Sequence, residues 1–459
     1  MNNRVSKPEG YRRSATPAPA VGAPAGWQAL RGSTVREISQ SVEDAIEQGT
    51  LRPGGLMPSV RELAGALRVS PATVARAFQE LRSRGVLTTR ERRGTRVSAR
   101  PSIARRSAVP VPGNVRDLST DNPDPQLLPR LAPILQRLDS PHHPYGESSV
   151  LPELRDEASR QLRELGVDPD HLMVAEGTFA AIERILSAHL KPGDRVAVED
   201  PGCIGVLDLV RAMGLHPVGV TVDEDGIDPQ MLSAVLGDGV EAAIVTPRAQ
   251  NPTGAALTSS RKADLREVLA EFPQVLVIED DYAGPVTGHP YHTLSDDRER
   301  WAVVRSVSKS LGPDLRLAIV AGDRITISRA EGRQALGPGW VSWIIQRLVV
   351  ELWRDSEAQQ AIVAAAEVYR NRVHALIEAL KTHGIAARGR SGLSVWIPAA
   401  EETPVMRALF QSGWAVAAGE LFRLSSPPGI RVTTAVLSEE DAPHLARDIA
   451  KAFERSARL

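Results

Sequence analysis

The chain has 459 residues, of which 42% are hydrophobic, so it is long enough to fill the cores of two or three domains. No apolar run approaches the ~20 residues that span a bilayer, and the first thirty residues lack the apolar core of a secretion signal. The single cysteine, Cys203, cannot form an internal disulfide. We therefore expect a globular, cytoplasmic protein without a membrane partner. The formal net charge of −1 averages over regions that differ, so its distribution is more informative.

Residues 1–33 are rich in proline, alanine and arginine. Such a composition cannot bury enough apolar surface to order a chain, and we expect a flexible N-terminal tail. From Thr34 onward apolar residues recur at helical spacing. The first helix is expected to begin there, with Thr34 and Glu37 forming a capping box, and to end at Gly49.

Two further helices are predicted close together. One begins at Ser59, where Ser59 and Glu62 form another capping box. The other follows with Ser70 as its N-cap and Pro71 in its first turn, and it ends before Gly85. Their apolar residues form stripes that would pack against the first helix.

A small hairpin is predicted after the third helix. Its strands are 86–89 and 95–98, and the basic sequence Arg-Glu-Arg-Arg-Gly joins them. Two helices joined by a tight turn and followed by such a hairpin are typical of a winged helix-turn-helix. Residues 34–100 contain twelve arginines and seven acids, an excess of five positive charges that suits a phosphate-facing surface. The alternative is a small helical domain with solvated arginines.

Two segments carry a family resemblance. Residues 51–64 read LRPGGLMPSVRELA and residues 69–74 read VSPATV, and both resemble the DNA-binding domain of GntR-type bacterial regulators, with Met57 where leucine is usual. The resemblance implies that residues of the two helices and the wing contact bases or phosphates of double-stranded DNA, although which of them read sequence is not determined by it. These residues are Arg61, Ser70, Thr73, Arg76, Arg92, Arg93 and Arg96.

A linker and a second domain follow. Residues 101–116 contain proline and arginine without periodicity and are typical of a linker. From Asp117 onward helical segments alternate with strand-like runs, at 195–199, 242–246, 275–280, 301–304 and 317–321. This alternation predicts a mostly parallel sheet with helices on both faces, whose ligands bind at the carboxyl ends of the strands. The more helical region after Trp340, with runs at 393–397 and 430–433, predicts a smaller C-terminal α+β lobe.

The stretch Arg305–Arg316, RSVSKSLGPDLR, follows one of these strands. It places the amine of Lys309 three residues after the hydroxyl of Ser306 and seven before the guanidinium of Arg316. An activated lysine forms a Schiff base with an aldehyde, and arginine binds phosphate through two parallel hydrogen bonds. Pyridoxal 5'-phosphate carries both groups, so the stretch indicates a site for that cofactor. The alternative for an isolated Lys309 is a solvated loop residue.

Other residues are suitably placed to complete such a site. Gly177–Phe179 precedes a helical run, so its backbone N–H groups can point at a phosphate. Asp280 ends a strand and can pair with a pyridinium nitrogen, whereas Tyr282 and Asn251 can bond a phenolic oxygen. Taken singly, each also fits a turn former or a half-buried aromatic, so their combination and order favour the site.

This order of motifs, from Asp117 to the C-terminus, resembles the fold-type I, aspartate-aminotransferase-like superfamily of pyridoxal-phosphate proteins. The resemblance implies that Lys309 forms the Schiff base, Asp280 pairs with the ring nitrogen and Arg431 binds a ligand carboxylate; a structural ion pair is the alternative for Arg431. It also implies cofactor contacts from Tyr145, reaching from the neighbouring subunit, and from Gly177, Thr178, Phe179, Asn251, Tyr282, Ser306, Ser308 and Arg316. No metal site is expected.

Three residues depart from that pattern. Cys203 stands where relatives usually have an aromatic residue that stacks on the pyridine ring. The resemblance implies that Cys203 contacts the cofactor from that position. Losing the stack is expected to weaken cofactor binding or to tilt the ring. Val150 and Ala249 replace a common glycine and histidine. As an alternative, Cys203 is a small buried hydrophobe, the commoner fate of a lone cysteine.

A GntR-type winged helix (α+β) joined to an α/β fold-type I aminotransferase-like domain, residues 117–459, is the architecture of MocR-type regulators. The resemblance implies a bacterial transcriptional regulator that binds operator DNA as a head-to-tail homodimer. Pyridoxal phosphate, alone or as an aldimine with an amino compound, would shift the equilibrium between DNA-binding arrangements. Control of vitamin B6 metabolism and control of amino-acid or amine metabolism both remain open.

Two other functions compete with this one. The first is a working aminotransferase with an accessory DNA-binding domain, which Lys309, Asp280 and Arg431 permit chemically. The second is a regulator that no longer holds the cofactor. Cys203 and the basic helix-turn-helix favour a sensor over an enzyme.

Overall fold

The computed structural model describes residues 27–47, 50–52, 54–83, 85–90, 94–98, 111–139 and 141–456. The chain divides into two compact units, with the boundary between Ser102 and Ile103. The first unit holds the described residues up to 98, and the second holds those from 111 onward.

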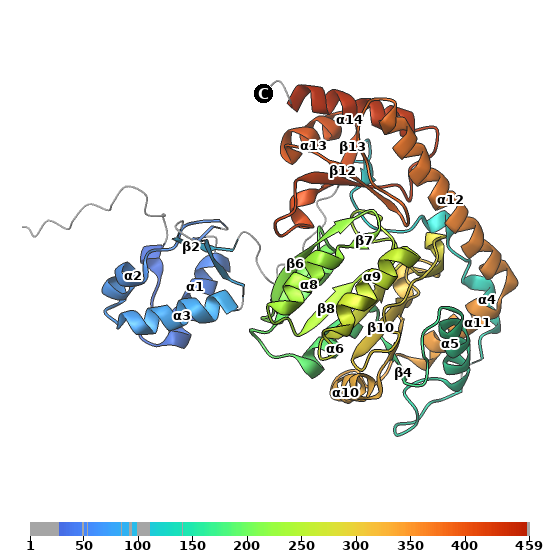
Figure 1. Cartoon of the computed structure of the whole chain (residues 1–459), viewed down its shortest axis with the longest axis horizontal. Coiled ribbons are helices and arrows are strands. Elements are labelled where there is room, and N and C mark those ends of the chain that lie inside the picture. The colour runs from blue at the N-terminus through green and yellow to red at the C-terminus, as the bar shows by residue number, and fades with distance from the viewer. Residues whose placement is uncertain are drawn as a thin grey trace, which may run out of the picture. The chain divides into compact units, whose positions relative to one another are not determined.

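The first unit is a three-helix bundle with a hairpin (Figure 1). Its elements are η1 (Trp27–Ala29), α1 (Val35–Glu47), α2 (Val60–Leu67), α3 (Pro71–Ser83), β1 (Leu87–Arg90) and β2 (Gly94–Val97). The two strands pair antiparallel. Apolar side chains from all three helices form one core, in which Ile38, Val74 and Phe78 are buried. The helical stripes expected from the sequence therefore face inward together.

Helix caps follow the expectation in one case and differ from it in another. Ser59 accepts from the backbone of Glu62 and the Glu62 carboxylate accepts from the backbone of Ser59, which is a complete capping box. Thr34 caps the backbone of Glu37, but the Glu37 carboxylate accepts from the backbone N–H of Ser33 at 2.8 Å instead of from Thr34. The Ser33 hydroxyl also donates to this carboxylate, so bonding to Ser33 satisfies two donors at once.

The N-terminal tail, expected over residues 1–33, ends before Trp27, because Trp27 and Leu30 belong to the first unit. Residues 1–26 lie outside the described part of the chain, but Trp27 packs against the core of the first unit and Leu30 is only 2% exposed. The surrounding proline and alanine residues gave no periodic pattern, so the sequence did not predict that these two apolar residues are packed in the core.

The second unit is built on a large sheet whose strand order is β4-β11-β10-β9-β8-β5-β6-β7. Strands β10, β9, β8, β5 and β6 run parallel to one another. Strand β11 is antiparallel to both β10 and β4, and β7 is antiparallel to β6. Their bounds are β4 (Leu172–Ala175), β5 (Arg195–Asp200), β6 (His216–Asp223), β7 (Gly226–Ile227), β8 (Ala242–Val245), β9 (Leu276–Asp281), β10 (Trp301–Ser306) and β11 (Ala318–Gly322). The expected mostly parallel sheet is confirmed.

Helices cover both faces of this sheet. Apolar side chains of α6 (Thr178–His189), α7 (Ile204–Ala212) and α10 (Arg324–Ala335) pack on one face. The other face packs on α8 (Pro229–Gly237) and α9 (Ser259–Ala270), which Figure 1 shows lying over the near side of the sheet, and on α5 (Pro152–Glu164), α11 (Trp343–Arg354) and α12 (Ser356–Lys381). Side chains alternate between the faces along each strand: Val196 and Val198 join the first core, Ala197 the second.

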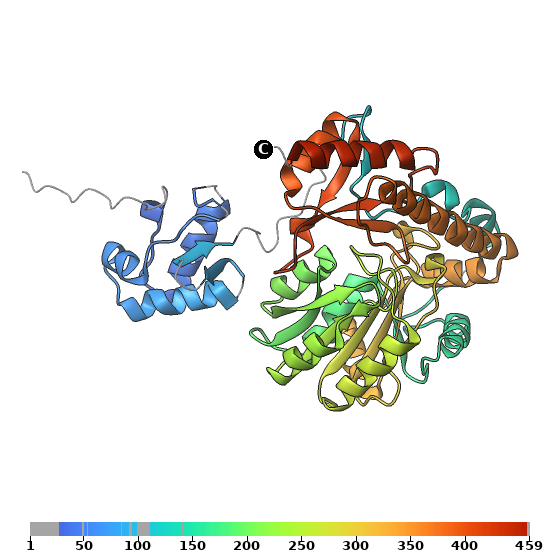
Figure 2. The ribbon, with the colours of Figure 1, turned by 45° about the horizontal axis from the view of Figure 1, so that its top comes forward.

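A smaller lobe carries a four-stranded sheet of order β12-β14-β13-β3. Its strands are β3 (Arg116–Leu118), β12 (Ser394–Pro398), β13 (Trp414–Ala418) and β14 (Gly429–Thr433), and α13 (Glu402–Gln411) and α14 (Ala442–Ser456) pack beside it (Figure 2). Arg116, expected to end the linker, instead begins β3 and pairs in parallel with Trp414. The sequence did not reveal β3, because a three-residue strand has too little alternation to recognise. The remaining short helices are η2 (Pro125–Leu127), α4 (Ala132–Arg137), η3 (Gly284–Thr287), η4 (Pro313–Leu315) and η5 (Gly419–Leu421).

None of the helices in the described part of the chain combines the length and the apolar composition that crossing a bilayer requires.

A buried ionic cluster lies at the carboxyl end of β9. Asp281 is fully buried, and its two carboxylate oxygens accept from Nε and Nη2 of Arg248 at 2.8 and 2.9 Å and from Nη1 of Arg305 at 2.7 Å. Burial by itself would raise the pKa of this carboxyl, but the two guanidinium groups outweigh it, and the pKa lies below its ordinary value. Among the described residues, Asp281 is the carboxylate that pairs with both arginines.

We predict that Asp281→Asn destabilises the second unit by about 3–5 kcal/mol, because it leaves two buried guanidinium groups without an anion. Chemical denaturation followed by circular dichroism measures the loss. The control is Glu164→Gln, since Glu164 pairs with Arg160 on the surface, where both side chains are more than half exposed. An exposed pair contributes about 0–1 kcal/mol, so equal losses in the two variants would contradict the prediction.

Candidate functional site

Strand β9 ends in three consecutive acids, Glu279, Asp280 and Asp281, all buried. Alternation sends Glu279 and Asp281 to the face covered by α8 and α9, and Asp280 to the opposite face with Leu276 and Ile278. Asp281 has its two arginines, and Glu279 accepts from Tyr291, Thr293 and the backbone of Leu294.

Asp280 differs from its two neighbours. Its Oδ1 is buried and has no hydrogen-bond partner among the described residues. Burial, followed by the negative charges of Asp281 and Glu199, raises the pKa of the Asp280 carboxyl well above its ordinary value. A buried carboxyl without a partner is costly. The free polar atom marks a place where a ligand with a positively charged or donating nitrogen would be stabilised.

Lys309 lies three residues after the end of β10 and is half-buried. Its Nζ is 2.9 Å from Oδ2 of Asp121 and also donates to the Asp121 backbone carbonyl. The same Nζ is 5.7 Å from the ring centroid of Tyr282. The lysine amine is therefore held in the interior of the second unit rather than in solvent, which the loop-residue alternative would require.

Tyr282 and Asn251 come from two different turns and connect to the same region. The Tyr282 hydroxyl donates to the carbonyl of Ala249 at 2.8 Å. Burial, then the charge of Asp121, raises the pKa of this phenol well above its ordinary value, so the hydroxyl stays protonated near neutral pH. Ala249 has a φ of 53°, a left-handed conformation that is unfavourable for alanine and typical of functional turns.

Arg431, on β14, is brought to the site from the small lobe. Its Nη1 donates to Oδ1 of Asn251 at 3.2 Å, its Nη2 donates to the Ser119 carbonyl at 2.5 Å, and its guanidinium lies 4.9 Å from the ring centroid of Phe422. The side chain is only 3% exposed, and its Nε has no partner among the described residues. No carboxylate pairs with it in the described part of the chain, so the structural ion pair is not found.

Gly177 and Arg316 lie directly against each other. Gly177, the N-cap of α6, has a φ of 92° and no side chain with which to cap the helix. A Cβ added there would lie 2.7 Å from Nη2 of Arg316, which donates to the carbonyl of Glu176. Arg316 itself is left-handed, with a φ of 45°. Uncapped N–H groups and an adjacent guanidinium form a site suited to an anion.

The remaining predicted contacts occupy varied positions. Ser306 donates to the hydroxyl of Ser308, so the two serines lie together. Thr178 begins α6. Phe179 packs its ring on Gly205 of α7, where a Cβ would be 2.2 Å from the ring. Tyr145 is 91% exposed, and its ring meets that of Trp340 edge to face.

Cys203 is half-buried at the N-cap of α7 and packs against the apolar core behind the sheet. Burial, followed by the charge of Asp280, raises the pKa of its thiol to about 12. The side chain is therefore a neutral thiol near pH 7. This agrees with a small apolar residue, and its contact with the cofactor ring stays a prediction.

The first unit presents a candidate nucleic-acid interface. Arg61 on α2 and Arg76 on α3 are exposed, as is Ser70, whose hydroxyl lies 2.8 Å from that of Thr73 at the start of α3. Arg96 on β2 is exposed and donates to the Gly54 carbonyl. Arg92 and Arg93 lie outside the described residues.

Several functional neighbours were missed by sequence reasoning. Asp121 lies in the sequence Asp-Asn-Pro-Asp-Pro, which has the composition of an ordinary turn, and nothing in it signals contact with Lys309. Glu199 was also missed: its buried carboxylate accepts from Thr246 and Gln250 and so supports the turn that carries Asn251. Burial raises the pKa of Glu199 to about 7. Only spatial proximity identifies these residues.

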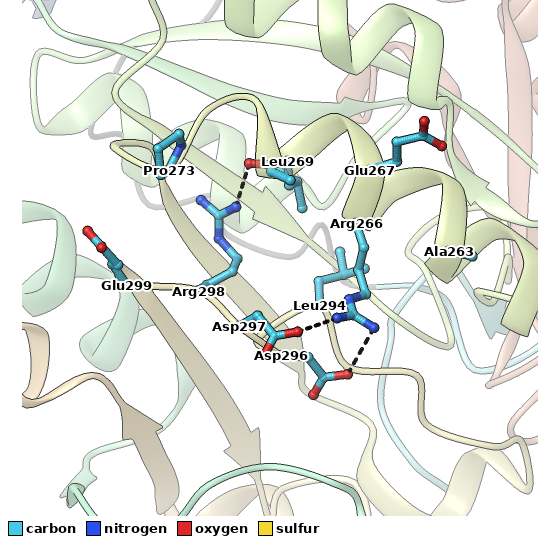
Figure 3. Close-up of a pocket in the computed structure, with 11 residues that line it drawn as sticks. Ala263, Arg266, Glu267, Leu269, Pro273, Leu294, Asp296, Asp297, Arg298 and Glu299 are labelled. Atoms are coloured by element: carbon cyan, nitrogen blue, oxygen red, sulfur yellow. Dashed lines mark hydrogen bonds and ion pairs between the residues drawn. The ribbon is translucent and has the colours of Figure 1, made fainter.

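A separate cavity of about 500 Å³ lies between α9 and the loop 294–299, at the amino-terminal edge of the sheet (Figure 3). Arg266 lies between Asp296 and Asp297 there, and Arg298 donates to the carbonyl of Leu269. Because Arg266 is paired with these two acids and the Lys309 group lies at the carboxyl edge, this cavity is not the candidate site.

Comparison with known proteins places both halves of the chain. The family model of the bacterial regulatory proteins, gntR family, matches residues 34–97, and that of aminotransferase class I and II matches residues 114–449.

Two curated relatives extend over most of the chain. The vitamin B6 salvage pathway transcriptional repressor PtsJ of Salmonella typhimurium is 39% identical over 93% of this chain and 100% of its own length. The HTH-type transcriptional regulator TauR of Rhodobacter capsulatus is 28% identical over 80% of this chain and 84% of its own length. Among solved structures, the kynurenine aminotransferase of Pyrococcus horikoshii superposes with a TM-score of 0.69 at 21% identity, covering 75% of this chain and 92% of that one. This last likeness concerns the fold alone.

Proposed function

The chain belongs to the MocR-type GntR transcriptional regulators, in which a winged helix-turn-helix is joined to an aminotransferase class I and II domain, and we propose that it senses pyridoxal phosphate to control its binding to an operator. The observation that carries the proposal is the coexistence, in one chain, of an exposed basic helix-turn-helix with an interior lysine at the carboxyl edge of a parallel sheet. In this arrangement the second unit serves as the ligand-responsive part.

The residues present fit pyridoxal phosphate. The unpartnered Oδ1 of Asp280 suits a ring nitrogen, and the uncapped α6 N-terminus beside Arg316 suits a phosphate. Lys309 supplies an amine whose side chain is largely buried within the second unit. When bound, pyridoxal phosphate supplies an aldehyde, which bonds covalently to amines. It also supplies a ring that withdraws electrons.

Each residue then has a distinct task. Lys309 would attach the aldehyde, Asp280 would hold a proton on the ring nitrogen, and Asn251 would donate to the phenolic oxygen. Tyr282 would donate to the same oxygen once its hydroxyl turned away from the carbonyl of Ala249. Ser306, Ser308, Thr178 and Arg316 orient the phosphate, while Phe179 and Cys203 pack near the ring. Arg431 would receive the carboxylate of an amino compound through Nε, which is buried and without a partner among the described residues.

In the first unit, Arg61, Ser70, Thr73 and Arg76 contact the bases or phosphates of double-stranded DNA, together with the wing arginines Arg92, Arg93 and Arg96. The exposure of Arg61 and Arg76 on the two helices supports this assignment. Phosphate contacts supply most of the affinity, and base contacts supply the selectivity.

We assign the second unit to sensing rather than to sustained catalysis. A bound ligand alters DNA binding only to the extent that it has different affinities for the two arrangements of the regulator. The likeness to PtsJ, a vitamin B6 salvage pathway repressor by name, supports the cofactor itself as the signal and genes of vitamin B6 metabolism as targets. An amino acid or amine is the other effector to be tested.

The protein would act as a head-to-tail homodimer in the cytoplasm. Tyr145 supports this assembly, because a tyrosine that is 91% exposed lies on a loop of the second unit and would reach the phosphate of the partner subunit.

The alternative is an active aminotransferase. The aminotransferase fold favours it, as does the Nε of Arg431, which has no partner within the described part of the chain. Incubation of the cofactor-loaded protein with an amino acid and a keto acid separates the two. A sensor stops after at most one half-reaction for each protein molecule, whereas an enzyme forms product over many turnovers.

We predict that Lys309→Ala abolishes the visible absorption of lysine-bound cofactor and removes the effect of pyridoxal phosphate on DNA binding. The DNA affinity of the cofactor-free protein should be unchanged, since the first unit is intact. Binding to DNA upstream of the protein's own gene is measured at one fixed salt concentration, because salt strongly alters such affinities.

The matched control is Lys262→Ala, which removes a lysine that pairs with Asp296 at the amino-terminal edge of the sheet. It should behave as the wild type in both measurements. A Lys309→Ala protein that kept the absorption and the cofactor response would refute the proposal.

We predict that Arg76→Ala weakens operator binding by about 1–3 kcal/mol if Arg76 reads a base, and lowers the salt slope of binding by about one if it holds a phosphate. Fluorescence anisotropy with operator and unrelated DNA at several salt concentrations distinguishes the two contacts. Arg36→Ala, on α1 outside the α2–α3 motif, is the control. Unchanged affinity and salt slope for Arg76→Ala would exclude Arg76 from the interface.

A further inference from the structure

Asp121 is an acidic residue placed directly against Lys309. The carboxylate Oδ2 is 2.9 Å from Nζ, the backbone carbonyl of Asp121 accepts from the same nitrogen, and the other carboxylate oxygen is buried without a partner among the described residues. Exposure of the two side chains is low, 13% for Lys309 and 23% for Asp121. This is a partly desolvated ion pair at the atom that would bind the cofactor.

The other groups around Lys309 do not replace this charge. Tyr282 faces Nζ from the end of β9, but burial keeps its phenol protonated. The carboxyl of Asp280 is assigned to the ring nitrogen of the cofactor, and burial keeps the thiol of Cys203 protonated. Arg431 approaches from β14, through the carbonyl of Ser119, and its positive charge acts in the opposite direction. The carboxylate with a direct contact to Lys309 is Asp121.

We propose that Asp121 is the counterion of the nitrogen that joins Lys309 to the cofactor. The inference rests on the proposed function, because it requires pyridoxal phosphate at Lys309, but it assigns a residue outside the motifs from which that function was predicted. Asp121 is a positioning residue that keeps a proton on the linking nitrogen.

The chemistry follows from charge balance. The Lys309 amine adds to the aldehyde carbon, a C=N bond replaces the C=O bond, and one water leaves. The nitrogen then exists either neutral or with one proton and a positive charge. A carboxylate within about 4–6 Å favours the charged form of such a group. The carboxylate of Asp121, partly withdrawn from water, would otherwise lose its partner when the ammonium of Lys309 disappears.

The regulatory consequence is that the cofactor remains attached to Lys309. Asp121 stabilises the protonated linkage in place of the ammonium, so joining the cofactor does not leave a partly buried carboxylate without a cation. Asp121 also follows β3 closely, and β3 is the first strand of the second unit. The ion pair therefore connects the state of Lys309 to the segment that begins this unit.

The test is a spectrophotometric pH titration of the full-length, cofactor-loaded protein, because the protonated and neutral linkages absorb at different wavelengths. We expect Asp121→Asn to lower the pKa of the linking nitrogen by about 1–3 units relative to the wild type. At a fixed pH between the two values, the variant should show mostly the neutral form. A purely structural role for Asp121 would not move this pKa.

Two controls separate charge from disturbance. Asp121→Glu keeps the carboxylate and should restore a pKa above that of Asp121→Asn. Asp117→Asn removes an equal charge from the same segment, where the Asp117 carboxylate accepts from Ser119 and not from Lys309, and should leave the pKa near the wild-type value. If Asp121→Asn does not fold, Asp121→Ser removes the same charge and must shift the pKa in the same direction.

The outcomes distinguish this inference from the function on which it rests. A visible band whose pKa is the same in the wild type and in the neutral Asp121 variants overturns the counterion and leaves the cofactor assignment standing. A wild-type protein without any such band overturns the cofactor assignment and the counterion with it.

Discussion

The second unit depends on how three adjacent carboxyl groups are accommodated where β9 ends between two layers of helices. A carboxylate in such a place needs a cation or several donors, because water is excluded from both faces of the sheet. Strand alternation divides the problem. Asp281 and Glu279 turn to one face, where two arginines and three hydrogen-bond donors satisfy them. Asp280 turns to the other and keeps one oxygen unsatisfied.

The two sides of the sheet therefore differ in how their buried acids are satisfied. The ionic cluster of Asp281, Arg248 and Arg305 neutralises its own charges and contributes to holding β9 and β10 in register. On the opposite side, one carboxyl oxygen of Asp280 has no partner among the described residues, and the N-terminus of α6 has no side-chain cap, so both suit a ligand. The same physical arrangement can bind a cofactor for catalysis or for sensing. The attached helix-turn-helix and the regulator relatives favour sensing here.

The candidate site is assembled from pieces that are remote in sequence. Arg431 arrives on a strand of the small lobe, and the segment containing Ser119 and Asp121 arrives immediately after β3 in the same lobe. Asp200, at the end of β5, further joins the large sheet to the lobe by accepting five hydrogen bonds from residues 424–426. A ligand that changes the contacts of Lys309 or Arg431 therefore acts on both lobes, which is what a conformational signal requires.

The sequence by itself determined the local elements and the chemical type of the site. Ser59 and Glu62 identified a helix start, and the alternation of strands and helices identified a mostly parallel sheet. The spacing of Ser306, Lys309 and Arg316 predicted a lysine and an arginine suited to a phosphorylated aldehyde. Spacing works for these because each depends on periodicity or on neighbours a few residues apart. Spacing did not predict that β3 pairs with β13, that Leu30 is buried in a core, or that the Glu37 carboxylate accepts a hydrogen bond from Ser33.

Only the tertiary structure decided which distant groups meet. Asp121 and Lys309 are 188 positions apart in the sequence, and Arg431 and Asn251 are 180 apart, so no local pattern records either contact. The partners of the three β9 acids likewise depend on which face each one reaches and on which side chains other elements supply there. Long-range packing decides whether each buried carboxyl group is charged, because a buried carboxylate depends on the partner that the fold brings to it. In the same way, it decides which groups surround Lys309.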